Sequence, residues 1–143
     1  MRYDLTEQVS LPGAYSFERL KDEYNKADIF AMPSVDSSIG SDGLPTVLIE
    51  SMAIGVPVVA ARKAGIPDLV QDRVTGLLAP PGDAKALARC LNELLFDKEL
   101  RINLIRKARM AVEAEFDINL SARQLLKLVE DYKQDAGLAQ AGH

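Results

Sequence analysis

The sequence has a single cysteine, a single histidine and no tryptophan among its 143 residues. One cysteine cannot form an internal disulfide or a cysteine-based metal site, so the chain is expected in a reducing compartment. No run of about eighteen apolar residues occurs, and the N-terminal residues do not resemble a signal peptide. These absences predict a cytoplasmic protein without a membrane span.

An excess of positive charge is also absent. The chain carries 17 basic and 21 acidic residues, for a formal net charge of −4. Proteins that hold nucleic acid through its phosphates need a basic surface, so nucleic acid is not an expected partner. The hydrophobic share of 48% and the charged share of 27% are instead ordinary for a globular domain.

The hydrophobic pattern alternates short apolar runs with longer amphipathic stretches, which is typical of an α/β fold. Strands are predicted over 28–32, 56–61 and 77–79. The predicted helices cover 17–27, 45–54, a stretch after Asp83, 98–115 and 118–133. Three strands are fewer than the roughly four to six of a stable open sheet. We therefore expect a partial, Rossmann-like parallel sheet with C-terminal helices, the later part of a doubly wound domain.

Helix boundaries and helix faces follow from individual residues. Ser16 and Asp83 are candidate N-caps, Pro45 suits a first helical turn, and Gly55 suits a helix end. The helix after Asp83 is expected to bury one face, on which lie Leu87, Cys90, Leu91, Leu94 and Leu95. The 118–133 helix carries a second apolar stripe of Ile118, Ala122, Leu125, Val129 and Tyr132.

Two carboxylates, Asp42 and Glu50, lie in or beside an apolar stretch. Ligands of open α/β sheets bind beyond the carboxyl ends of the strands, where the helix from Pro45 is predicted to begin. Free N–H groups near Thr46 would attract a phosphate there, and Gly43 would let the backbone approach it closely. The turn is therefore a candidate anion site.

Glu50 lies four residues after Thr46 and so on the same helix face. A carboxylate among apolar neighbours needs hydrogen-bond donors, and the vicinal diol of a ribose supplies two. Asp42 could meet hydroxyls at the other end of the same ligand, so the two residues together indicate a sugar nucleotide. Two plainer interpretations stay open: Asp42 as a turn or capping residue, and Glu50 as a solvated helix residue.

The ordered segments "ADIFAMPS", "DGLPTVLIESMAIGVPVV", "GIPDLV" and "TGLLAPPGD" resemble the donor-binding half of retaining glycosyltransferases of family 4, which have the GT-B fold. The resemblance runs from about Val9 to the helix near Tyr132. It implies that Glu50 binds the nucleotide ribose and that the catalytic residue Asp42 lies by the donor sugar. It further implies that the backbone that follows Asp42 contacts the sugar and the diphosphate, through Gly43, Leu44, Pro45 and Thr46.

The activity implied is transfer of a hexosyl group, with retention, from a nucleoside diphosphate sugar to a glycan or lipid-linked acceptor. The resemblance implies no cofactor beyond this donor and no catalytic metal, consistent with the lack of an Asp-x-Asp motif. Family members also have an N-terminal acceptor domain and, at the start of the donor domain, an Arg and a Lys for the diphosphate. The chain lacks these parts, so we expect no turnover by it alone. Residues 1–134 form the expected donor-binding portion, and 135–143 a disordered tail.

Two functions other than sugar transfer stay open. The first is a non-catalytic module that binds a nucleotide sugar or a protein partner, and the second is a GT-B relative such as a sugar-nucleotide epimerase. Arg62 and Lys63 could reach the pocket mouth, although a solvated pair is favoured. His143, at the tail, is favoured as an end residue over a catalytic base.

Two kinds of surface contact are considered as well. A basic helix can lie on anionic lipid, but acidic neighbours favour a solvated face over peripheral membrane association. The basic residues concerned are Lys98, Arg101, Arg106, Lys107 and Arg109. An incomplete sheet exposes an edge strand, which predicts self-association.

Overall fold

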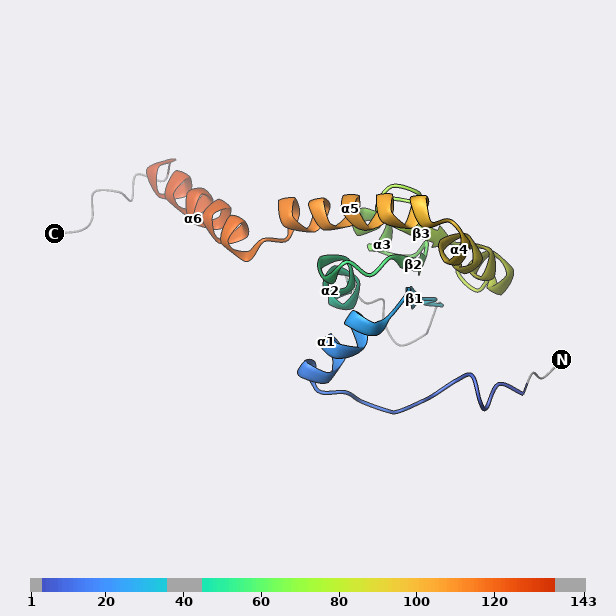
Figure 1. The fold of residues 1–143 in the computed structure, drawn as a ribbon. Coiled ribbons are helices and arrows are strands. Elements are labelled where there is room, and N and C mark those ends of the chain that lie inside the picture. The colour runs from blue at the N-terminus through green and yellow to red at the C-terminus, as the bar shows by residue number, and fades with distance from the viewer. Residues whose placement is uncertain (1–3, 36–44, 136–143) are drawn as a thin grey trace.

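The computed structural model describes residues 4–35 and 45–135 of the chain. These residues form an α/β structure (Figure 1), with its elements in the order α1 (Phe17–Lys26), β1 (Phe30–Met32), α2 (Thr46–Ile54), β2 (Val58–Ala61), α3 (Ile66–Leu69), β3 (Leu77–Ala79), α4 (Ala84–Phe96), α5 (Lys98–Glu115) and α6 (Ile118–Asp135). The three predicted strands and five longer helices are confirmed, with boundaries that differ by a few residues at most.

The helices begin and end where the capping residues predict. Ser16 accepts a hydrogen bond from the Arg19 amide at the start of α1, and Asp83 accepts one from the Ala86 amide at the start of α4. Gly55 ends α2 with a φ of 94°, a left-handed conformation that glycine adopts without steric cost. Pro45 differs slightly from the prediction, because it is the N-cap of α2 and precedes the first turn.

The sheet is parallel and has the order β1-β2-β3 in the part of the chain described. Phe30 lies opposite Val58, and Val59 lies opposite Leu77. All four residues of β2 are buried, because this strand is paired on both sides and covered on both faces. β1 has β2 on one side only, and no described strand pairs with its other edge.

Alternate residues of the strands separate two apolar cores. Val58 and Ala60 face a larger core with Leu48 and Met52 of α2, to which α3 and the second half of α5 also contribute. The opposite face forms a smaller core of Val59, Leu77, Leu94 and Leu104, with Cys90 packed against it. Cys90 thus lies beside the core as predicted. Leu95 does not, since half of its surface is exposed.

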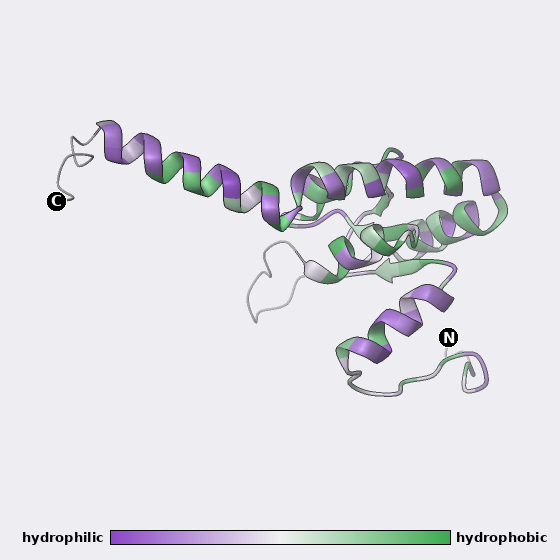
Figure 2. Ribbon diagram, turned by 60° about the vertical axis from the view of Figure 1, so that its left-hand side comes forward, coloured by the Kyte–Doolittle hydropathy of each residue, from purple (hydrophilic) through white to green (hydrophobic). Residues whose placement is uncertain are grey.

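α6 projects away from the rest of the fold (Figures 1 and 2). Apolar and polar residues share its surface in Figure 2, but its apolar side chains are exposed, Tyr132 to 68% and Leu125 to 63%. The predicted apolar stripe of α6 is therefore present, but no helix or strand among the described residues packs against it. No helix within residues 4–35 and 45–135 has the length and apolar character needed to cross a bilayer.

Candidate functional site

The N-terminus of α2 lies at the carboxyl end of β1, where ligands of parallel sheets bind. Pro45 supplies no side-chain cap, and the first turn of α2 contains no acidic residue. Among residues 4–35 and 45–135, no side chain accepts from the backbone N–H groups at this helix start, and the helix dipole favours an anion there. Three residues of the predicted site, Asp42, Gly43 and Leu44, lie outside the described part of the chain.

Glu50 is half-buried on α2, one turn beyond Thr46. Its Oε2 atom accepts a hydrogen bond of 3.3 Å from the hydroxyl of Tyr24 on α1. The same hydroxyl lies 3.3 Å from the carbonyl oxygen of Val47, so the two acceptors share one proton. Among the described residues no hydrogen bond reaches Oε1 of Glu50. Within the described ranges, the carboxylate is thus hydrogen-bonded at one oxygen and has no such partner at the other.

Tyr24 is buried, with only 4% of its surface exposed, and it contacts both α2 and β1. Its ring meets the ring of Phe30 on β1 edge-on, with 5.7 Å between the centroids. Burial raises the pKa of Tyr24 to about 12, and the nearby Glu50 carboxylate adds to the shift. The phenol therefore stays protonated and remains a hydrogen-bond donor at every physiological pH.

A hollow of about 290 Å³ lies between α1 and α2. It is lined by Phe17, Leu20, Lys21, Tyr24, Glu50, Ala53 and Ile54. Its wall is mostly apolar, and Glu50 contributes the one carboxylate among these lining residues. Such a surface suits a ligand that combines a flat or apolar group with hydroxyls. The sequence placed Glu50 on α2, but it did not indicate that α1 forms the opposite wall.

A second hollow, of about 220 Å³, lies at the carboxyl ends of all three strands. Its lining includes Val35, Ala61, Ala79 and the first residues of α4. The acidic group there, Asp83, already accepts a hydrogen bond from the Ala86 amide at 2.9 Å. This hollow offers less chemistry than the first, so we place the candidate site at α1 and α2.

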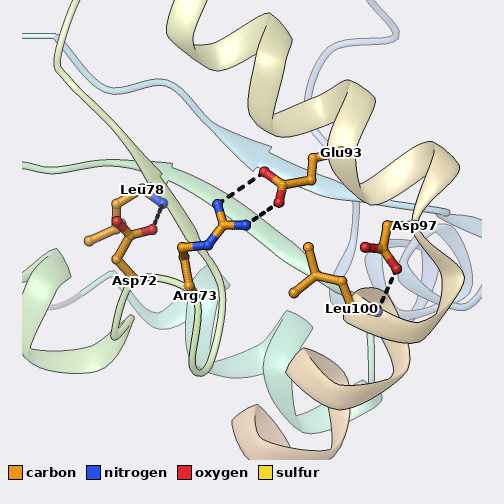
Figure 3. A network of polar contacts seen from close by, with 6 residues as sticks. All are labelled: Asp72, Arg73, Leu78, Glu93, Asp97 and Leu100. Atoms are coloured by element: carbon orange, nitrogen blue, oxygen red, sulfur yellow. Dashed lines mark hydrogen bonds and ion pairs between the residues drawn. The ribbon is translucent and has the colours of Figure 1, made fainter.

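Arg62 and Lys63, the two basic residues that could reach the pocket mouth, both contact other parts of the fold. Arg62 forms a 2.7 Å ion pair with Asp72, and Lys63 donates a 2.7 Å hydrogen bond to the Val35 carbonyl. The other oxygen of Asp72 accepts a hydrogen bond from the Leu78 amide (Figure 3). Arg62 therefore braces the turn before β3 and remains exposed, in agreement with the favoured interpretation of a solvated residue.

Figure 3 shows that neighbouring polar contacts also serve the fold. Arg73 pairs with Glu93 of α4 through two hydrogen bonds, and Asp97 caps α5 by accepting from the Leu100 amide. Two basic residues of α5 also contact backbone outside that helix: Arg101 donates to the Leu94 carbonyl and Arg109 to the Ala53 carbonyl. Within the described ranges, no cluster of three or more His, Cys, Asp or Glu side chains could hold a metal ion.

Residues 2–111 match the family model described as glycosyl transferases group 1. The amylovoran biosynthesis glycosyltransferase AmsK of Erwinia amylovora is 40% identical over 128 residues, which cover 89% of this chain and 31% of that protein. The sucrose-phosphate synthase of Thermosynechococcus elongatus superposes with a TM-score of 0.76 at 32% identity, over 92% of this chain and 32% of its own. Anabaena Alr3699/HepE in complex with UDP gives a TM-score of 0.70 at 26% identity, over 76% of this chain and 29% of its own.

These matches define the fold as part of a GT-B glycosyltransferase, and the chain belongs to the glycosyl transferases group 1 family. The predicted resemblance is confirmed at this level. The chain spans about a third of the length of the relatives that it matches, 31% in the case of AmsK.

Proposed function

We propose that this chain supplies the donor-binding site for transfer of a hexosyl group from a nucleoside diphosphate sugar to a glycan or lipid-linked acceptor, with retention of the anomeric configuration. Family membership supports sugar transfer in general. The complexes of HepE with UDP and with UDP-glucose support a nucleotide sugar as the ligand. The name of AmsK supports a role in polysaccharide biosynthesis.

The observation that carries the proposal is the half-buried carboxylate of Glu50 beside an apolar hollow, with one oxygen held and the other open. A ribose diol fits the open oxygen, because its two hydroxyls are donors and a carboxylate is an acceptor only. Glu50 lies four residues from Thr46, or about 6 Å along the helix axis. Ribose and diphosphate are adjacent in the ligand, so the diphosphate would face the start of α2.

Catalysis in this proposal depends on electrostatics. Transfer with retention requires stabilisation of an oxocarbenium-like centre and of a departing diphosphate. The N-terminus of α2, through the amides near Thr46, would stabilise the leaving group, and Asp42 would act beside the donor sugar. The donor is a substrate, and no cofactor or metal ion is invoked. The acceptor domain belongs to the remaining part of such an enzyme, so the chain by itself is proposed to bind without turnover.

Isothermal titration of the chain with UDP and with GDP tests this function. Wild-type protein should bind one of them saturably, and Glu50→Ala should weaken the binding about 10- to 100-fold while circular dichroism shows the same fold. Glu130→Ala is the matched control, because Glu130 is exposed on α6, which projects away from the site (Figure 1). A folded wild type that binds neither nucleotide, or a Glu50→Ala variant that binds normally, would contradict the proposal.

A non-catalytic binding module is the second candidate function. It rests on the same hollow, whose lining suits ligand binding and does not by itself require a reaction. Incubation of the donor sugar nucleotide with the chain and a separately produced acceptor domain separates the two: product formation supports the transferase, and binding without product supports the module.

A further inference from the structure

We infer that Tyr24 is a positioning residue for Glu50: its phenol holds Oε2 of the carboxylate and so leaves Oε1 oriented for the ribose hydroxyls. The inference rests on the proposed function of Glu50 as the ribose acceptor. Tyr24 lies on α1 and acts through Glu50, so it need not contact the ligand itself.

The contact joins two helices that are separated in the sequence. Tyr24 reaches two acceptors on α2, the Val47 carbonyl and the Glu50 carboxylate, each at 3.3 Å. These acceptors are three residues apart and lie on one turn of the helix. The phenol therefore spans a single helical turn and fixes the carboxylate relative to the backbone of α2.

Tyr24 is itself held rigidly enough to do this. It is 4% exposed, and the edge-on contact with Phe30 anchors its ring against β1. A glutamate side chain has several rotatable bonds, whose freedom must be lost before it can hold a ligand. Because the hydrogen bond from Tyr24 orders Glu50 in the free protein, less ordering remains to be done on binding. The phenol stays protonated below about pH 10 and so remains a hydrogen-bond donor to the carboxylate.

The alternative is that Tyr24 only packs between α1, α2 and β1. Tyr24→Phe separates the two roles, because it keeps the ring and removes the hydroxyl. The ligands are UDP and GDP, each compared with its 2′,3′-dideoxy analogue, which lacks both ribose hydroxyls. Tyr132→Phe is the control, since Tyr132 is exposed on α6.

Tyr24→Phe should weaken binding of the ribonucleotide about three- to tenfold, the range for loss of one hydrogen bond. Binding of the dideoxy analogue should not change, because that ligand makes no use of the oriented carboxylate. In a Glu50→Ala background, Tyr24→Phe should have no further effect on any residual binding. Tyr132→Phe should match the wild type with both ligands.

Four results overturn the inference. Equal weakening of both ligands by Tyr24→Phe means a packing role, and unchanged ribonucleotide binding means that the hydroxyl is dispensable. In both cases, loss of binding in Glu50→Ala leaves the proposed function standing. If the folded wild type binds no ribonucleotide, or if Glu50→Ala binds it normally, the proposed function fails and the inference fails with it.

Discussion

Gly76 lies directly against Val58: a Cβ atom on Gly76 would stand 2.5 Å from Cγ2 of Val58 and 3.0 Å from its carbonyl oxygen. Val70 would be 2.7 Å away on the same side. No side chain fits in this space without moving β2. The turn before β3 therefore packs on the central strand by backbone contact.

Gly76→Ala is accordingly expected to destabilise the fold by about 1–3 kcal/mol, the usual cost of overpacking. Urea denaturation followed by circular dichroism measures this change. Gly82→Ala is a useful comparison, because nothing lies within 4 Å of its added Cβ and only the φ of 75° opposes it. Its cost should be about 1–2 kcal/mol, that of a left-handed residue alone. A Gly76→Ala variant as stable as the wild type would contradict the packing argument.

The same Leu→Ala substitution should destabilise the fold strongly on α5, where the side chain is buried, and hardly at all on α6, where it is exposed. Leu104 is 1% exposed in the smaller core, so Leu104→Ala should cost about 2–5 kcal/mol. Leu125 is 63% exposed, so Leu125→Ala should stay within about 0.5 kcal/mol of the wild type. The same urea titration reports both. A large loss in Leu125→Ala would mean that α6 packs against the fold in solution.

Alkaline pH should weaken the fold through Tyr24. Its folded-state pKa of about 12 exceeds the ordinary value of 10.0, so the neutral phenol is favoured in the folded state. The resulting stabilisation is fully present below pH 10 and is lost as the pH rises toward 12. Tyr24→Phe removes this dependence. The free energy of unfolding at pH 9, 10 and 11 should therefore fall more steeply for wild type than for the variant, and parallel curves would contradict the assignment.

The open edge of β1 predicts self-association. Ala31 is exposed in the middle of this strand, and a lysine there should block pairing with another chain. Sedimentation velocity over a range of concentrations should show association of the wild type that Ala31→Lys weakens. Ala114→Lys on the exposed side of α5 adds the same charge and should leave the association unchanged. Monomeric wild type at all concentrations would show that the edge is not an interface.

Much of this architecture could be predicted from the sequence, because local chemistry decides it. Helix caps depend only on residues a few positions away, as at Ser16, at Asp83 and at Gly55, which ends α2. The continuous apolar run at β2 is likewise a local feature of the sequence. The contact of Tyr24 with Glu50 could not, because it joins residues 26 apart and depends on how α1 packs against α2. In the sequence, Tyr24 falls at helical spacing with Phe17 and Leu20, and this spacing indicates a buried ring but no role for the hydroxyl.

The same limit applies to faces of helices. Phe17 and Leu95 fall at helical spacing with buried residues, yet Phe17 is 69% exposed. Periodicity identifies a side of a helix, whereas the neighbouring elements decide how far that side is covered. Of the predicted site, Pro45, Thr46 and Glu50 lie together on α2, and the role of Asp42 stays a prediction.

In the proposed function, Glu50 accepts the ribose hydroxyls of the donor. The most direct test is a cycle of four dissociation constants, for a ribonucleoside diphosphate and its 2′,3′-dideoxy analogue with wild type and with Glu50→Ala. Wild type should prefer the ribonucleotide by about 10- to 100-fold, the range for hydrogen bonds to a charged group, and Glu50→Ala should show no preference. A preference that persists in Glu50→Ala would place the ribose elsewhere and contradict the account.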